Sequence, residues 1–247
     1  MKQAKGSVVV WAWLPLLVSG MAGASARDVK ESDKLAEDPT KVVTQVGVSY
    51  ADQLKISGSL SLDPVRKINA SMNKDASEWR LGGSWLFDFG ILNFNFSRKQ
   101  FDHGANQTSY NVGTFVPLSA MGFAPGGWQI FPTAGLNYND GDIACEVGSQ
   151  GCGMVNVDTS SDFVLIPNAS KGGYLGAFAL KPLAPEWTLI TFGVGSLGSN
   201  DYHGYVLGLG MGYKFTERQS ISTYAYTSDN SFGSDQQLGI AYRYQFN

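Results

Sequence analysis

The feature that most constrains this chain is a period-two alternation of apolar and polar residues, which recurs along most of its length. It is clearest over residues 205–215, where Tyr, Leu, Leu, Met, Tyr and Phe occupy the odd positions and glycine or lysine occupies all but one of the even ones. Successive side chains of a strand point to opposite faces, so the pattern predicts a strand with one apolar face.

Ten segments share this alternation. They are residues 54–62, 79–87, 91–97, 108–117, 128–138, 173–182, 187–197, 205–215, 219–227 and 237–246. A soluble β-sandwich also alternates, but strands of about ten residues match a tilted crossing of a bilayer. Aromatic residues gather at the segment ends, as they do at membrane–water boundaries. The sequence therefore predicts an all-β fold, a transmembrane antiparallel up-and-down β-barrel, with ten strands preferred over eight or twelve.

Two regions leave the strand count open. Residues 42–50 also alternate, and we interpret them as an extension of the first strand or an inward-folded lead-in. Residues 154–157 and 163–166 could pair as a hairpin above the membrane within a long connection. If that hairpin spans the membrane instead, the count becomes twelve.

The first 26 residues read as an export signal. Two lysines precede an apolar run over residues 8–18, and the small-residue motif Ala24-Ser25-Ala26 follows. The run is too short for a spanning helix, which needs about 20 residues. We expect a signal peptide over 1–26, a periplasmic tail and lead-in over 27–52, and an outer-membrane barrel over 53–247.

Charge and cysteine content narrow the function. The formal net charge is -3, so nothing favours nucleic acid as a partner. Cys145 and Cys152 are the two cysteines, and in an oxidising compartment they predict a disulfide that closes a small loop. With two histidines in the chain, a zinc site has little support, and we expect no metal and no cofactor.

The connections between the predicted strands are alternately short and long. Short ones occur at 87–90, 183–186 and 216–219, whereas longer polar ones occur at 63–77, 98–107, 140–171, 198–203 and 228–234. With the signal, the alternation and a last strand that ends in Phe246, the chain resembles small Gram-negative outer-membrane β-barrels. The resemblance implies a monomer in the outer membrane, in contact with lipid and lipopolysaccharide, inserted by the barrel-assembly machinery.

Five cations fall on the polar faces of the predicted strands and would line the interior. They are Lys55, Arg80, Lys181, Lys214 and Arg243. Such a lumen would favour anionic solutes. In a narrow barrel the same cations could instead pair with carboxylates and fill the interior. The function expected is a narrow pore or transport conduit, or a structural surface barrel.

An enzymatic alternative rests on two short pairs. Asp140 with Asp142, and Asp201 with His203, resemble the Asp-x-Asp and Asp-x-His pairs of the omptin proteases, which are ten-stranded outer-membrane barrels. The resemblance implies that these residues activate a water together, with an aspartate orienting the imidazole. Motifs this short recur by chance in polar loops, so we expect the protein not to be an enzyme.

Overall fold

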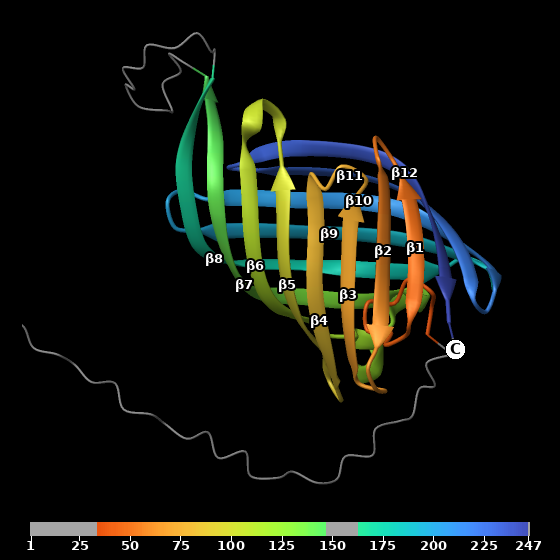
Figure 1. Ribbon diagram of the computed structural model, residues 1–247. Helices are drawn as coiled ribbons and strands as arrows, with labels where there is room; N and C mark the ends of the chain where they lie inside the picture. The colour runs from red at the N-terminus through yellow and green to blue at the C-terminus, as the bar shows by residue number, and fades with distance from the viewer. Residues whose placement is uncertain (1–33, 147–162, 247) are drawn as a thin grey trace, which may run out of the picture.

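The computed structural model describes residues 34–146 and 163–246, which form a closed ring of strands (Figure 1). The strands are β1 (Gln45–Tyr50), β2 (Leu54–Ser61), β3 (Arg66–Asn73), β4 (Glu78–Phe87), β5 (Gly90–Gln100), β6 (Asn106–Phe115), β7 (Gln129–Glu146), β8 (Phe163–Pro182), β9 (Trp187–Gly198), β10 (His203–Thr216), β11 (Gln219–Asn230) and β12 (Gly233–Gln245). Short 3-10 helices η2 (Asp102–Gly104), η3 (Leu118–Met121) and η4 (Pro125–Gly127) lie in the connections. No helix among the described residues is long and apolar enough to cross a membrane.

Each strand pairs antiparallel with its neighbours in sequence, and β1 closes the ring against β12. In that last pair Val48 lies opposite Tyr242, and Figure 1 shows β1 in orange beside β12 in blue. Closure leaves no strand edge with unpaired backbone groups, which a barrel needs in order to stand in hydrocarbon. The predicted all-β antiparallel barrel is confirmed.

The preferred count of ten strands is wrong, because the wall has twelve. The two additional strands are β1, which we had interpreted as a lead-in, and β3, which lies inside the expected loop 63–77. In β3 the alternation is masked by small and polar residues, and only Ile68 and Met72 mark its apolar face. Register with β2 and β4 makes it a strand, so the tertiary context overrides a weak local signal.

The hairpin that we considered as a route to twelve strands is not the source of the extra pair. Residues 163–166 begin β8 and pair with β7, where Ile143 lies opposite Ile166, while residues 154–157 lie outside the described residues. β7 and β8 thereby extend well beyond the predicted segments 128–138 and 173–182. In Figure 1 these two strands project above the rest of the wall.

The strand register separates two faces. Large apolar side chains on the outer face are exposed, with one from nearly every strand: Val48, Ile56, Ile68, Leu81, Phe94, Tyr110, Leu136, Leu175, Leu197, Leu209 and Leu238. The opposite parity is dominated by Ser, Asn, Gly and charged residues in β1–β6 and β12. An apolar exterior around a polar interior is the arrangement of a membrane-spanning barrel, whereas in water such a band would drive aggregation.

Two outward-facing lysines of β8 give the height of the apolar band. Lys171 and Lys181 share the parity of the exposed Leu175, and only Gly, Leu and Ala occupy the outward positions between them. Ten residues of strand rise about 33 Å, and a tilt of about 35–45° reduces this to about 25 Å along the barrel axis. The band is therefore as tall as the hydrocarbon-facing belt of known transmembrane barrels.

The two ends of the barrel differ, and we name them by what they hold. The terminal end holds the described ends of the chain and the connections 62–65, 88–89, 116–128, 183–186 and 217–218. The loop end holds the connections 51–53, 74–77, 101–105, 199–202 and 231–232. The even number of strands brings both described ends of the chain to the same end of the wall.

Candidate functional site

The lumen carries an excess of positive charge. Eight charged side chains of the wall share the inward parity, six basic and two acidic: Lys55, Lys67, Arg80, Lys99, Lys214 and Arg243, against Glu78 and Asp235. Glu78 Oε1 accepts a hydrogen bond from Lys55 Nζ at 2.7 Å, and Asp235 forms an ion pair with Lys99. Each wall carboxylate is thus committed to one lysine, which leaves the net charge of the lumen wall positive.

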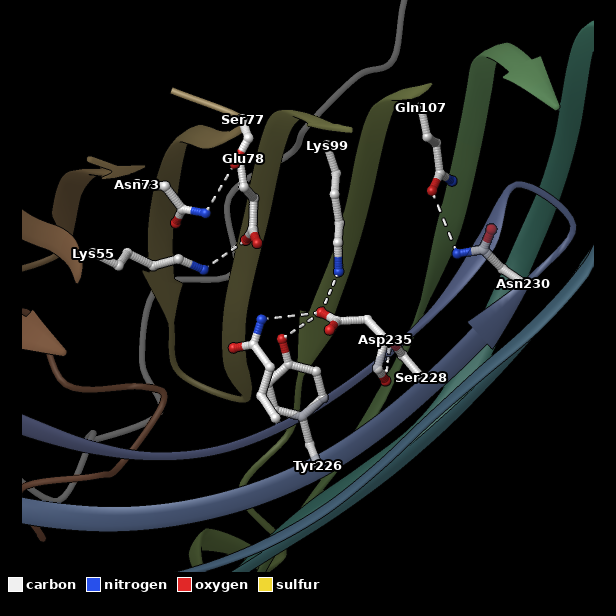
Figure 2. Close-up of polar contacts among 11 residues, drawn as sticks. Lys55, Asn73, Ser77, Glu78, Lys99, Gln107, Tyr226, Ser228, Asn230 and Asp235 are labelled. Carbon is white, nitrogen blue, oxygen red and sulfur yellow. Dashed lines mark hydrogen bonds and ion pairs between the residues drawn. The ribbon is translucent and has the colours of Figure 1, made fainter. Parts of the chain in front are cut away.

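Two polar contacts bridge the lumen in its loop-end half, as Figure 2 shows. Lys99 on β5 pairs with Asp235 on β12, and Asn230 Nδ2 on β11 donates to Gln107 Oε1 on β6 at 3.4 Å. Each bridge joins strands five steps apart in a ring of twelve. Tyr226 Oη also donates to Asp235 Oδ2 at 3.0 Å. These contacts form a bar across the lumen and narrow it on this side.

Three of the cavities in the lumen have lining residues in common, and an arginine belongs to the lining of each neighbouring pair. The loop-end cavity, of about 300 Å³, and the middle chamber, of about 290 Å³, share Arg80. The middle chamber and the terminal-end cavity, of about 390 Å³, share Arg243. Within the described residues, no carboxylate lies within ion-pair distance of Arg80.

The middle chamber combines cations with neutral polar groups. Lys67, Arg80 and Arg243 line it together with serines and asparagines of β2–β5, and no carboxylate is among its described lining residues. Ser84 Oγ donates to Asn93 Oδ1 at 2.6 Å, whereas the buried Nδ2 of Asn93 has no hydrogen-bond partner in the described part of the chain. A chamber that combines three cations with hydroxyl and amide groups, and has no carboxylate among its described lining residues, suits an anion better than a cation.

A glycine makes room for the polar lining of this chamber. A Cβ atom at Gly82 would lie 2.6 Å from Asn95 Oδ1 and 2.9 Å from Asn69 Nδ2. These distances are shorter than real side chains allow, so the two asparagines fill the space that a larger residue would need. The absence of a side chain at Gly82 therefore leaves room for the amide groups of Asn69 and Asn95 in the chamber wall.

The opposite side of the lumen is filled by apolar side chains. Ile91, Phe131 and Leu180 are almost completely buried, and Phe178 stacks with Phe192 at 6.3 Å between ring centroids. These residues face inward from β5 and from β7–β9 in the terminal-end half. The middle chamber therefore lies on the side of β1–β5 and β12, whereas the cavities at the two ends are also lined by β6 and β9–β11. The lumen is narrower than its strand number suggests.

Of the five predicted lumen cations, four lie on the inward face. Lys55 and Lys214 are paired, the latter with Glu217 at 3.1 Å, while Arg80 and Arg243 line the middle chamber. Lys181 departs from the expectation, because it has the outward parity of Leu175 and donates to the carbonyl of Gly126 outside the wall. Glycines on both faces of β8 obscure its parity in the sequence.

Three inward charged residues were not predicted from the sequence. Lys67 lies in β3, which we had taken as a loop, and Lys99 lies just beyond the predicted segment 91–97. Continuing the alternation of Asn93, Asn95 and Ser97 by one step would have placed Lys99 inside. Asp235 lies just before the predicted segment 237–246, and the same extension would have found it.

The residues of the enzymatic alternative are not brought together. Asp140 and Asp142 have the outward parity on β7, and Asp142 Oδ2 accepts a hydrogen bond from Asn106 Nδ2 at 2.8 Å. His203 Nδ1 lies 3.0 Å from the carbonyl oxygen of Asp201, not from its carboxylate. β7 and β10 are three strand steps apart, roughly 14 Å. Within residues 34–146 and 163–246, no group of three or more His, Cys, Asp or Glu is placed to hold a metal ion.

The predicted disulfide is only partly within the described chain. Cys145 lies near the end of β7, opposite Val164 of β8, beyond the apolar band. Its expected partner Cys152 lies outside the described residues, as does the export signal 1–26. Both therefore stay predictions.

Comparison with known proteins gives likeness of fold alone. No family model and no curated protein matches the chain. The translocator domain of autotransporter NalP from Neisseria meningitidis gives a TM-score of 0.49 at 12% identity, over 82% of this chain and 86% of that one. The NanC porin gives 0.47 at 9%, over 83% and 99%. An outer membrane channel from Pseudomonas putida F1 gives 0.46 at 9%, over 86% and 100%.

Likeness at this level carries no argument about activity. The architecture stands on the chain's own geometry, which is a closed antiparallel wall, apolar outside and polar inside. The chain is thus a β-barrel of the outer-membrane type, and its subfamily is not identified.

Proposed function

We propose that this protein is an outer-membrane conduit that passes small anionic solutes through a narrow lumen. One observation carries the proposal: Arg80 and Arg243 both line the middle chamber and each lines one neighbouring cavity, and the middle chamber has no carboxylate among its described lining residues. A cation at each junction replaces part of the hydration of an anion and repels a cation. The solute would pass from one arginine to the next.

The apolar band supports placement in the outer membrane. A band of about 25 Å matches the hydrocarbon-facing belt of such barrels, and the closed wall satisfies its backbone without water. We place the terminal end in the periplasm, because bacterial barrels carry both chain ends there. Export by residues 1–26 and insertion as a monomer by the barrel-assembly machinery belong to the same proposal.

The size of the lumen limits the solutes. The middle chamber holds about 290 Å³, and buried apolar side chains around Phe131 fill the opposite side of the lumen. Barrels that pass large hydrated solutes use 16–18 strands. A twelve-stranded wall with one side filled therefore suits solutes of a few heavy atoms.

Ion selectivity in planar lipid bilayers tests the proposal. In a potassium chloride gradient, the zero-current potential of the purified protein should have the sign of an anion-preferring pore. Arg80→Glu should move this potential toward cation preference, since the side chain lines two of the three cavities. Lys181→Glu is the matched control, because it makes the same charge change on the outer face and should leave the potential unchanged.

A second candidate function is a closed structural barrel. The cross-lumen pair Lys99–Asp235 and the buried apolar cluster favour it, since both reduce the free lumen. Bilayers that stay silent with the folded wild type, with Asp235→Asn and with a variant whose residues 34–43 are replaced by a Gly–Ser sequence would support this candidate and refute the conduit.

A further inference from the structure

The segment that precedes β1 is folded into the lumen at the terminal end. Thr40, Lys41 and Val42 have exposed fractions of only 2%, 8% and 5%, although they belong to no strand. The carboxylate of Glu37 packs against Gly212, where a Cβ atom would lie 2.7 Å from Glu37 Oε1. Residues 34–43, which we call the terminal plug, therefore occupy the mouth of the barrel rather than the space outside it.

The wall holds the terminal plug from several directions. Arg243 Nη1 on β12 donates to the carbonyl of Ala36 at 2.9 Å, and Lys67 Nζ on β3 donates to the carbonyl of Lys41. Ser59 Oγ on β2 donates to the carbonyl of Val43 at 2.7 Å. β10, which Glu37 contacts, and β3 are five steps apart in the ring of twelve, so the plug reaches almost the full width of the mouth.

The terminal plug is also organised within itself. Asp38 Oδ1 accepts hydrogen bonds from the backbone N–H of Thr40 at 2.7 Å and from its hydroxyl at 2.6 Å. Lys34 Nζ donates to the carbonyl of Thr40 at 3.2 Å, and the N–H of Lys41 donates to the carbonyl of Asp38 at 3.1 Å. The plug is thus a compact turn and not an extended tail.

Its attachment differs from that of the wall. Thr44, which follows the plug, is held by two backbone groups of the wall. The N–H of Phe246 donates to the carbonyl of Thr44 at 2.8 Å, and the N–H of Ser61 donates to the Thr44 hydroxyl at 3.1 Å. In the described part of the chain, residues 34–43 belong to no strand, and wall side chains donate to the carbonyl groups of Ala36, Lys41 and Val43. Segments with few ladder bonds open at a lower free energy than the strands around them.

We propose that residues 34–43 are a removable plug, anchored at Thr44, that closes the periplasmic mouth of the lumen. The role of the plug in closing a transport path rests on the proposed conduit. Its position in the mouth of the barrel does not. Arg243 lines the middle chamber and also bonds Ala36 of the plug. A passing anion and the seated plug therefore compete for the same guanidinium, and anion passage requires the plug to leave it.

Thiol labelling tests the plug without reference to transport. Ser59→Cys places a thiol where the wall contacts Val43, beneath the plug. A water-soluble maleimide should label it at least about tenfold faster when residues 34–43 of the full chain are replaced by a Gly–Ser sequence of equal length. Asp88→Cys, on the exposed turn between β4 and β5, should react at one rate in both backgrounds. Equal rates at Ser59→Cys in two folded proteins would overturn the proposal.

A charge change gives a second, milder opening. Glu37→Lys sets a cation against Arg243 and Lys41, which act on Glu37 in this structure, and should also accelerate labelling at Ser59→Cys. Asp88→Lys makes the same charge change on the turn 88–89 of the terminal end and should not. If the Gly–Ser replacement fails to fold, the comparison of Glu37→Lys with Asp88→Lys tests the plug instead.

The two proposals fail separately. Fast labelling in the plug variants, with bilayers that stay silent for both the wild type and the Gly–Ser replacement, would keep the plug and refute the conduit. Anion-preferring current in the wild type, with equal labelling in all backgrounds, would keep the conduit and refute the plug. If both hold, the Gly–Ser replacement should also raise the conductance severalfold.

Discussion

An arginine on the outer face of β8 should destabilise the barrel far more than an arginine in the lumen. Leu175 is 70% exposed and lies between Lys171 and Lys181, which bound the apolar band on the same face. Leu175→Arg therefore puts a guanidinium near the middle of the hydrocarbon. Charged substitutions at that depth cost about 2–4 kcal/mol in transmembrane barrels, which is roughly a 30- to 700-fold change in the folding equilibrium.

Denaturant unfolding in lipid vesicles measures this cost directly. Gln237→Arg is the matched control, because Gln237 faces the lumen and its Nε2 lies 3.1 Å from Asp235 Oδ2, so the new cation meets a carboxylate. Leu175→Ala controls for the loss of the leucine side chain. Equal free energies of unfolding for Leu175→Arg and Gln237→Arg would refute the assignment of the two faces.

Three further predictions concern the lumen. Asp235→Asn should strengthen anion preference, since Lys99 loses its counter-ion across the lumen; the zero-current potential reports it. Gly82→Val should lower single-channel conductance by pushing polar side chains into the middle chamber, whereas Gly195→Val, with no atom within 4 Å of its Cβ position, should not. Burial raises the pKa of the Glu37 carboxyl, so the plug position with Glu37 buried is favoured below this pKa and weakened as the pH rises through it. Acidification should therefore reduce the conductance of the wild type and leave that of Glu37→Gln unchanged.

The charges around Glu37 act against the effect of burial. Arg243 on β12 and Lys41 within the plug both lower the pKa of Glu37, but desolvation is the larger effect. Lys214, Glu186 and Glu217 line the same cavity from neighbouring elements. The Glu37→Gln comparison is needed because these groups also contribute to the field at the mouth.

The architecture was largely predictable because each side chain of the wall faces either the apolar exterior or the polar lumen. Strands such as β10 and β12 show the alternation openly, and the structure places their large apolar residues outside. β3 lacks this contrast, since Ala70 and Asn69 differ little in size, and it becomes a strand only through its register with β2 and β4. Local pattern alone could not supply that information.

The site was predictable one residue at a time and not as an arrangement. Parity along a strand places Arg80 and Arg243 inside, but it cannot say that both line the same chamber. The pair Lys99–Asp235 joins strands that are distant in the ring, so it depends on closure and stagger of the wall. The terminal plug depends on the same closure, because β2, β3, β10 and β12 surround it only in the finished barrel.

The most direct test of the conduit is the zero-current potential of the double variant Arg80→Glu/Arg243→Glu beside that of the wild type, across a potassium chloride gradient. Both arginines line the middle chamber and each also lines one neighbouring cavity, so the proposed route of a solute passes both. The wild type should give the sign of anion preference and the double variant the opposite sign. The same sign and size of potential in both proteins would contradict the account.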